Sequence, residues 1–288
     1  MRSETEMLEL ILDTAREDER IRAVMMNGSR AVSASRGDIF QDFDIVYFVT
    51  ERAPFIHNLE WIRRFGELMI LQLPDEMQEP PPEDAPGYAY LMQFADGNRI
   101  DLTIFPISRL AELEKDSQSL LLLDKDGLFG RLDPPSDAGY LPSPPTAKQF
   151  ADCVNEFWWV CAYVAKGLWR EEILYAKAAF EIVREELLEM LVWYTGVRTG
   201  FSVSPGKFGR RLPELLEPEL KTLLLKTYAG AGIDETWEAL FCMCALFRRA
   251  ALEVAGQFGF DYPYGDDERV SAHLRHVRRL PKNARQMY

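Results

Sequence analysis

Cysteine is scarce in this chain: only four of its 288 residues are cysteines, and no two of them form a CxxC pair. All four stand among apolar neighbours: Cys153, Cys161, Cys242 and Cys244. A free cysteine in such surroundings behaves as a small hydrophobic side chain. We therefore expect neither a zinc site nor a need for an oxidising compartment.

Long hydrophobic runs are also missing. No apolar stretch approaches the roughly 20 residues that are needed to span a bilayer. The N-terminal segment MRSETEMLEL is charged throughout, unlike a secretory signal. We expect a cytoplasmic protein with no membrane partner, and nothing in the sequence implies an obligate protein partner.

Basic residues are in short supply in the first half of the chain. Residues 1–145 contain 27 acidic and 14 basic side chains, whereas residues 146–288 contain 19 of each, so the first half carries the whole net charge of −13. Nucleic-acid binding relies on Lys and Arg that neutralise phosphates, so we expect no nucleic-acid partner. An acidic surface suits a cationic ligand or a metal ion, although solubility is the commoner reason for such charge.

Helical and strand-like patterns alternate in the first half. Helices are predicted over residues 3–18 and 58–67, and strands over 21–28, 42–50 and 67–74. The clearest element is a hairpin over residues 88–106, because Asp96-Gly97 between two apolar runs is a strong turn signal. This half should form a mixed β-sheet with flanking helices.

The composition changes near residue 132. Residues 132–146 are rich in proline and indicate a linker or an irregular crossover. Beyond them only helical patterns occur, over residues 147–196 with a break near Gly167, after Pro213, over 234–258 and over 266–280. We predict an α+β protein, with the sheet in a domain of residues 1–135 and an all-α helical bundle in residues 136–288.

Two aspartates stand side by side in the strand-like run 42–50. Asp42 and Asp44 are two residues apart, so their side chains project from the same face, about 6.5–7 Å apart along a strand. Neighbouring carboxylates repel, and burying them is costly without compensation. A divalent cation removes that cost, and Mg²⁺ prefers oxygen ligands. A solvated strand edge is the commoner explanation of such a pair taken alone.

A third acid and a Gly-Ser turn extend this pattern. Asp101 interrupts the second strand of the hairpin and could meet the aspartate pair if the two strands are neighbours. Three converging carboxylates suit two-metal phosphoryl transfer. Gly28 and Ser29 follow a strand, where backbone amides and a hydroxyl can hold phosphate oxygens, and Arg30 adds a positive charge. Taken singly, an ordinary turn and a surface acid are the commoner explanations.

The combination is more specific than its parts. An apolar strand, Gly-Ser, twelve further residues, Asp-Phe-Asp-Ile and a later strand aspartate resemble the signature of the DNA polymerase β-like nucleotidyltransferase superfamily. One position departs from that signature, since Asn27 stands where an apolar residue is usual. Longer stretches in both halves resemble the aminoglycoside 6-adenylyltransferases, the streptomycin-modifying group: ERIRAVMMNGSR, FQDFDIVYFV, LMQFADGNRIDLTIFP, CVNEFWWVCAYVAKGLWREEILYA and RTGFSVSPGK.

The resemblance implies an activity and a division of labour. It implies transfer of AMP from ATP to a hydroxyl of streptomycin with release of pyrophosphate, which confers antibiotic resistance. It also implies that residues 1–135 are the nucleotidyltransferase domain and that residues 136–288 are a helical aminoglycoside-binding domain, with the site in the cleft between them.

The resemblance also implies roles for the motif residues. Gly28 and Ser29 would contact the ATP phosphates, with Arg30 close by. Asp42 and Asp44 would bind Mg²⁺, with two ions in the site. Asp101 would be the third carboxylate, which either shares a metal or accepts the proton of the attacking hydroxyl. We favour the role of base for Asp101, because an alcohol must lose its proton to attack phosphorus.

Cations in the helical half are further candidates. Lys166 and Arg170 stand four apart on one helix face, where they could reach ATP phosphates, and we include Lys166 among the nucleotide-binding residues. A solvated face shared with Glu171 and Glu172 is the alternative. Lys207 is a weaker candidate of the same kind.

Aromatic, histidine and acidic residues of the same half have less specific interpretations. Three tryptophans could stack on drug rings, but their spacing is more typical of a helical core: Trp158, Trp159 and Trp169. Two histidines could bind a metal, but the basic residues around them favour a solvated face: His273 and His276. Three acids are available to a cationic drug: Glu156, Glu185 and Glu186.

Two other functions stay open. The chain could be a nucleotidyltransferase that acts on RNA or protein, although the lack of a basic stripe argues against RNA. It could also be an inactive nucleotide-binding module, but all three acids of the signature are present.

Overall fold

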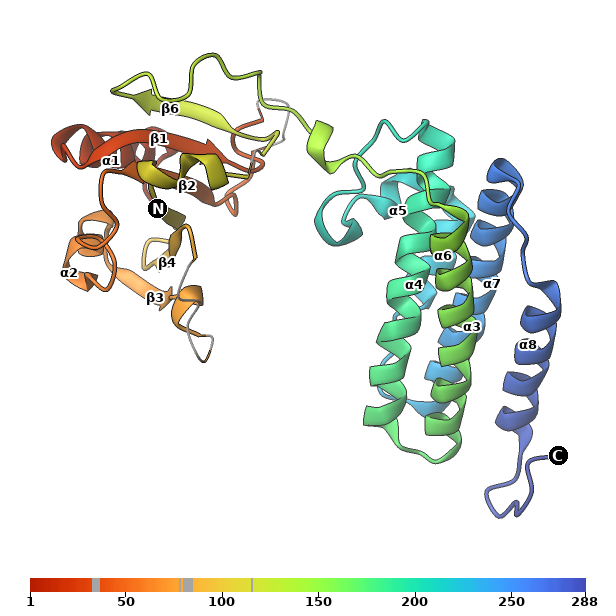
Figure 1. The fold of residues 1–288 in the computed structure, drawn as a ribbon. Helices are drawn as coiled ribbons and strands as arrows, with labels where there is room; N and C mark the ends of the chain where they lie inside the picture. The colour runs from red at the N-terminus through yellow and green to blue at the C-terminus, as the bar shows by residue number, and fades with distance from the viewer. Residues whose placement is uncertain (33–36, 78, 80–84, 115) are drawn as a thin grey trace. The chain divides into compact units, whose positions relative to one another are not determined.

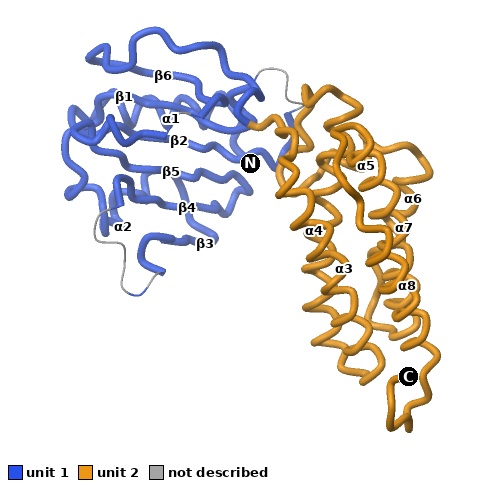
Figure 2. The backbone as a smooth tube through the Cα atoms, turned by 45° about the vertical axis from the view of Figure 1, so that its right-hand side comes forward, with its two compact units in different colours: residues 1–139 blue, residues 140–288 orange. Residues whose placement is uncertain are grey.

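The structure is a computed structural model and describes residues 1–32, 37–77, 79, 85–114 and 116–288. The chain divides into two compact units, Met1–Gly139 and Tyr140–Tyr288 (Figure 2). The boundary expected between residues 135 and 136 lies a few residues earlier, in the same Pro-rich segment. None of the helices in the described ranges is both long enough and apolar enough to cross a bilayer.

The first unit is built on a six-stranded mixed sheet (Figure 1). The strand order is β3-β4-β5-β2-β1-β6, with β2 and β5 parallel and the other neighbours antiparallel. The strands are β1 (Ile21–Asn27), β2 (Phe43–Val49), β3 (Leu68–Gln72), β4 (Tyr88–Phe94), β5 (Arg99–Pro106) and β6 (Leu120–Asp124). The expected mixed sheet is confirmed. Strand β6 was not predicted, because a short run of four leucines does not distinguish a strand from a helical segment.

The two faces of the sheet are covered differently. Helices α1 (Glu4–Glu17) and α2 (Leu59–Ile62) contribute to the main core, which buries Ile45, Tyr47 and Leu102 from the sheet. The opposite face carries a smaller cluster: Ala23, Met25, Val46, Phe48 and Phe105. Because strand side chains alternate between faces, the acids at even positions of β2 and odd positions of β5 belong to this second face.

The second unit contains only helices among its regular elements. They are α3 (Ala147–Trp169), α4 (Ile173–Thr199), α5 (Leu212–Leu215), α6 (Pro218–Lys226), α7 (Ile233–Phe258) and α8 (Tyr264–Arg279). Short 3₁₀ turns occur along the chain at Arg63–Phe65, Pro74–Glu76, Ile107–Glu112, Ala138–Tyr140 and Lys207–Gly209. The all-helical prediction for this half is confirmed.

The break between α3 and α4 lies slightly later than expected. Gly167 remains helical, and the chain turns at residues 170–172, where Glu171 adopts φ +60°. A Cβ at Gly167 would stand only 3.0 Å from the Cα of Ala176. This glycine therefore allows the start of α4 to pack closely against α3.

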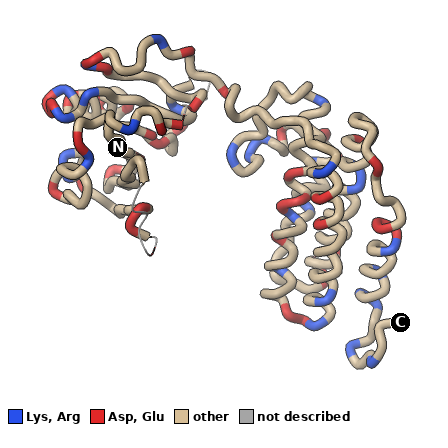
Figure 3. The backbone as a smooth tube through the Cα atoms, viewed as in Figure 1, with Lys and Arg blue, Asp and Glu red and all other residues tan. Residues whose placement is uncertain are grey.

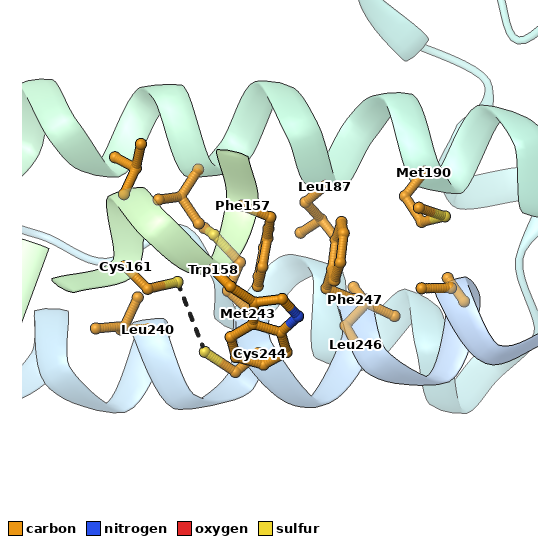
Figure 4. Close-up of a cluster of buried hydrophobic side chains, with 14 of the residues drawn as sticks. Phe157, Trp158, Cys161, Leu187, Met190, Leu240, Met243, Cys244, Leu246 and Phe247 are labelled. Carbon is orange, nitrogen blue, oxygen red and sulfur yellow. Dashed lines mark hydrogen bonds between the residues drawn. The ribbon is translucent and has the colours of Figure 1, made fainter. Parts of the chain in front are cut away.

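The helical core joins α3, α4 and α7 (Figure 4). The rings of Phe157 and Phe247 stack with centroids 3.6 Å apart. The thiols of Cys161 and Cys244 lie 4.0 Å apart and are free. Burial raises the pKa of the Cys161 thiol well above its ordinary value. These cysteines are apolar packing residues, as the sequence indicated.

Candidate functional site

The three aspartates of the signature lie at one end of the parallel pair of strands. Asp44 of β2 and Asp101 of β5 are direct register partners. Their strands are therefore about 4.8 Å apart at this point, and both side chains leave the same face. Asp42 lies two residues before Asp44, just outside β2. The structure thus brings together carboxylates that are 57 residues apart in the sequence (Asp44 and Asp101).

The Gly-Ser turn closes over the same place. Strand β1 runs antiparallel to β2 and ends with Asn27 opposite Asp44. Gly28 follows with φ +74°, in the left-handed region that favours glycine. Any Cβ at Gly28 would overlap the carboxylate of Asp44. The next residue, Ser29, accepts a hydrogen bond from Gln41 Nε2 at 3.4 Å.

Asn27 has a structural role that explains its departure from the apolar signature. Its Oδ1 accepts a hydrogen bond of 2.8 Å from the hydroxyl of Ser119, which precedes β6. This bond ties the end of β1 to the edge strand that sequence patterns did not reveal. Neither Ser119 nor its link to Asn27 could be found from local periodicity.

Arg99 lies beside the three aspartates and was not among the residues predicted from the sequence. Its Nε and Nη2 donate to the two carboxylate oxygens of Asp101 at 2.8 and 2.7 Å. Its Nε also lies 3.7 Å from an oxygen of Asp42. The bond to Asp101 is the main cause of a raised Arg99 pKa, to which the charges of Asp42 and Asp44 add. The signal was available, since residues 99 and 101 share a strand face.

Arg30 is engaged beneath the same loop. Its guanidinium donates to the carbonyl oxygens of Gln41 at 2.7 Å and of Asp42 at 3.2 Å. It stacks over the ring of Phe43 at 4.0 Å and lies 3.3 Å from Glu4. The side chain is only 10% exposed. In this structure Arg30 fixes the backbone that carries Asp42.

The donor set matches magnesium chemistry, but it is not arranged as a ready metal site. Within the described part of the chain, no three His, Cys, Asp or Glu side chains are grouped to hold an ion. Carboxylate oxygens on adjacent strands are the ligands that Mg²⁺ prefers. Both oxygens of Asp101, however, are bonded to Arg99. The residues fit the ion chemically, and its binding at Asp101 requires Arg99 to share or release that carboxylate.

A cavity of about 660 Å³ opens on the same sheet face. It is floored by apolar side chains that include Met25 and Phe129. Its wall also carries charged residues: Glu114, Asp116, Arg131 and Asp133. Met25 lies on β1 two residues before Asn27, which pairs with Asp44, so this cavity lies near the three aspartates.

Two of the cations predicted in the second unit, Lys166 and Arg170, lie one helical turn apart and line the same cavity. Lys166 stands near the C-terminal end of α3, with its Nζ 4.8 Å from the ring centre of Tyr163 and 5.2 Å from that of Tyr175. Arg170 caps the same helix. Lys207 lies in a separate turn, against the exposed ring of Phe208. The nucleotide-binding role of Lys166 stays a prediction.

The aromatic and histidine predictions are met in part. Trp158 is buried, as a core residue should be, but Trp159 is 61% exposed and bonds to the hydroxyl of Tyr163 at 2.7 Å. The expectation of a core position is therefore wrong for Trp159. His273 is half-buried and contacts the hydroxyl of Tyr288 at 2.6 Å. The basic residues around the two histidines, Arg275, Arg278 and Arg279, are exposed, as expected for a solvated face.

Acidic residues do gather on the helical unit. Burial is the main cause of a raised Glu186 pKa, and the nearby charges of Glu156, Glu189 and Glu185 add to it. Acidic positions are visible close together along α4 (Figure 3). The acids named as available to a cationic drug are thus neighbours in space.

Comparison with known proteins decides the family. Residues 1–277 match the family described as streptomycin adenylyltransferase. The chain belongs to that family. The match spans both units and includes the three aspartates and the Gly-Ser turn. The expectation drawn from the sequence motifs is confirmed.

Three curated members of the family are similar over most of their length, and each is named aminoglycoside 6-adenylyltransferase. The proteins from Bacillus subtilis and Campylobacter jejuni are each 40% identical over 270 residues, covering 93% of this chain and 95% and 93% of their own. The protein from Staphylococcus aureus is 36% identical over 266 residues, covering 91% of this chain and 94% of its own. A crystal structure of the Bacillus subtilis enzyme is 38% identical, covers 97% of this chain and all of its own, and superposes with a TM-score of 0.48.

Proposed function

We propose that this protein transfers AMP from ATP to a hydroxyl of an aminoglycoside, streptomycin in the first place, and releases pyrophosphate. Such a modification in the cytoplasm would confer resistance to the drug. The observation that carries the proposal is the meeting of Asp42, Asp44 and Asp101 beside the Gly28 turn. Family membership and the printed names of the relatives support the same reaction.

The three aspartates and the residues of the Gly-Ser turn have distinct roles in this proposal. Asp42 and Asp44 hold the Mg²⁺ that accompanies ATP, and Asp101 receives the proton of the acceptor hydroxyl or shares a metal. Bound Mg²⁺ would neutralise charge that develops on the phosphate oxygens. The turn at Gly28 and Ser29 offers backbone amides and a hydroxyl to the phosphates. Arg30 positions Asp42 through the loop carbonyls.

The charge of the chain supports a cationic acceptor. Residues 1–145 carry the entire acidic excess. Acidic residues line the cavity near the three aspartates, and others lie close together on α4. Fields of this sign concentrate ligands that carry guanidinium or ammonium groups. The aminoglycosides are ligands of this kind, whereas RNA is repelled.

The test is pyrophosphate release with ATP, Mg²⁺ and streptomycin. Asp42→Asn, Asp44→Asn and Asp101→Asn should each lower kcat by about a thousandfold or more, since each removes charge that stabilises the transition state. Asp126→Asn is the matched control, because Asp126 pairs with Arg22 in the same unit and is not one of the residues of the proposed site. Circular dichroism should show all four variants folded.

Other outcomes would select the alternatives. Turnover on an RNA 3′ end but not on streptomycin would indicate a different acceptor. ATP binding without turnover on any acceptor would indicate an inactive module. A variant of Asp42 or Asp44 with near wild-type activity would remove those residues from the proposed site.

A further inference from the structure

Arg99 lies close to the carboxylates of the three aspartates of the proposed site. Its planar fork uses two parallel hydrogen bonds to hold both oxygens of Asp101. The same guanidinium is 3.7 Å from Asp42. The side chain is 39% exposed and Asp101 is 21% exposed, so the pair is only partly screened by water.

The position of this cation has two opposite consequences. Without a divalent ion, three adjacent carboxylates repel one another, and Arg99 offsets that repulsion. When a divalent ion approaches Asp101, the same guanidinium repels it and occupies the oxygens that would ligate it. Two unit charges 4 Å apart interact by about 1 kcal/mol in water and by more at a partly buried site.

We propose that Arg99 is a built-in counter-cation that holds Asp101 beside Asp42 and Asp44 in the metal-free protein and competes with the divalent ion for Asp101. The inference rests on the metal site of the proposed function. It goes further, because it couples metal binding to the release of one arginine from one carboxylate. By linkage, whatever strengthens the Arg99–Asp101 pair weakens the metal, and the reverse.

The experiment titrates the metal-free full-length protein with Mn²⁺ and follows free Mn²⁺ by electron paramagnetic resonance. Arg99→Met removes the charge and keeps an unbranched apolar side chain in place of the arginine's aliphatic stem. It should bind Mn²⁺ about tenfold more tightly than the wild type. In chelator its Tm should fall below that of the wild type, and added Mg²⁺ should raise its Tm by a larger increment.

The matched control is Arg22→Met. Arg22 of β1 also forms a fork with an aspartate, Asp126, which follows the end of β6, and its Nε lies 2.7 Å from Oδ2. Its loss should leave Mn²⁺ affinity unchanged within about twofold. If Arg99→Met does not fold in chelator, Arg99→Gln is measured instead, with the same expected gain, because glutamine is neutral and keeps an amide NH₂ group that can donate to Asp101.

The outcomes separate this inference from the proposed function. Wild-type binding that Asp42→Asn abolishes, with unchanged or weaker binding in the Arg99 variant, overturns the counter-cation and leaves the metal site standing. No Mn²⁺ binding by either the wild type or the Arg99 variant removes the metal site itself. Binding by the Arg99 variant alone supports the inference, since the arginine then excludes the ion.

Discussion

At the scale of single residues, Gly28 shows how one backbone conformation determines the position of Asp44 in the proposed site. Its φ of +74° is strained for any other residue, and a Cβ there would overlap the Asp44 carboxylate. The absence of a side chain therefore serves both the turn and the position of the acid. Arg30 supports the same geometry from below by fixing the carbonyl of Asp42.

Gly28→Ala should impair activity more than folding. The left-handed conformation costs about 1–3 kcal/mol of stability, and the new methyl group must displace Asp44 as well. We expect kcat/KM for AMP transfer to fall at least about a hundredfold, because small displacements of reacting groups have effects of this size. The measurement is steady-state kinetics beside urea unfolding.

Gly97→Ala is the control for backbone strain alone. Gly97 has φ +90°, and among the described residues other than Gly97 and its two chain neighbours, no atom lies within 4 Å of where a Cβ would stand. It should lose similar stability and keep its activity. Equal loss of activity in the two variants would contradict the importance of the Gly28–Asp44 contact.

At the scale of elements, a buried polar group joins α7 to α8. Arg248 donates from Nε and Nη2 to the two oxygens of Asp267, each at 2.5 Å, and Tyr262 donates to the same carboxylate at 2.8 Å. Burial by itself would raise the Asp267 pKa, but these donors hold it below its ordinary value. The Asp267 side chain is only 6% exposed. The position of α8 therefore depends on this carboxylate being charged.

Asp267→Ala should lower the free energy of unfolding by about 2 kcal/mol at pH 7, because it removes a buried carboxylate that accepts several hydrogen bonds, although Arg248 is itself 37% exposed. Because the folded-state pKa is depressed, the stabilisation is present above the unfolded pKa near 3.8 and is lost as pH falls through the folded value. The difference between variant and wild type should therefore shrink below about pH 4. Urea unfolding across pH measures it.

Asp266→Ala is the control on the same helix. Asp266 pairs with Arg269, and both side chains are at least half exposed. Surface pairs contribute at most about 1 kcal/mol, so this variant should be near neutral. A loss at Asp266 as large as that at Asp267 would contradict the assigned role of burial.

At the scale of the whole molecule, each unit has a core of its own. The helical core draws only on residues 150–277, and the two clusters of the sheet unit draw only on residues 7–129. Self-contained cores of this size are the mark of units that can fold alone. The Pro-rich segment that the sequence marked as a linker lies where the two units meet in the chain.

The fragment 140–288 should therefore fold cooperatively by itself. We expect a helical circular dichroism spectrum and a single sigmoidal melting transition. The fragment 173–288 is the control, since it lacks α3 and with it the Phe157 ring that stacks on Phe247. That shorter fragment should be unfolded or molten. Gradual, non-cooperative melting of 140–288 would show that its core needs the first unit.

Local pattern was enough to predict most elements, because it acts through neighbours in the chain. Apolar runs bounded by turn residues marked β1, β2 and β3, alternation marked the hairpin, and helical spacing marked the helices, whose N-termini form capping boxes at Ser3 and Thr146. The same alternation placed Asp42 and Asp44 on one face. Local pattern failed at β6, because a short run of leucines does not distinguish a strand from a helical segment.

The sequence by itself determined the elements, the acidic first half and the spacing of the Gly-Ser turn and aspartate pair. Only the tertiary structure decided that β5 lies beside β2, in parallel, with Asp101 in register with Asp44. It also decided that Arg99 holds Asp101 and that Arg30 holds the loop of Asp42. The physical reason is that strand order and register are set by hydrogen bonds between segments far apart in the chain, which no local periodicity specifies.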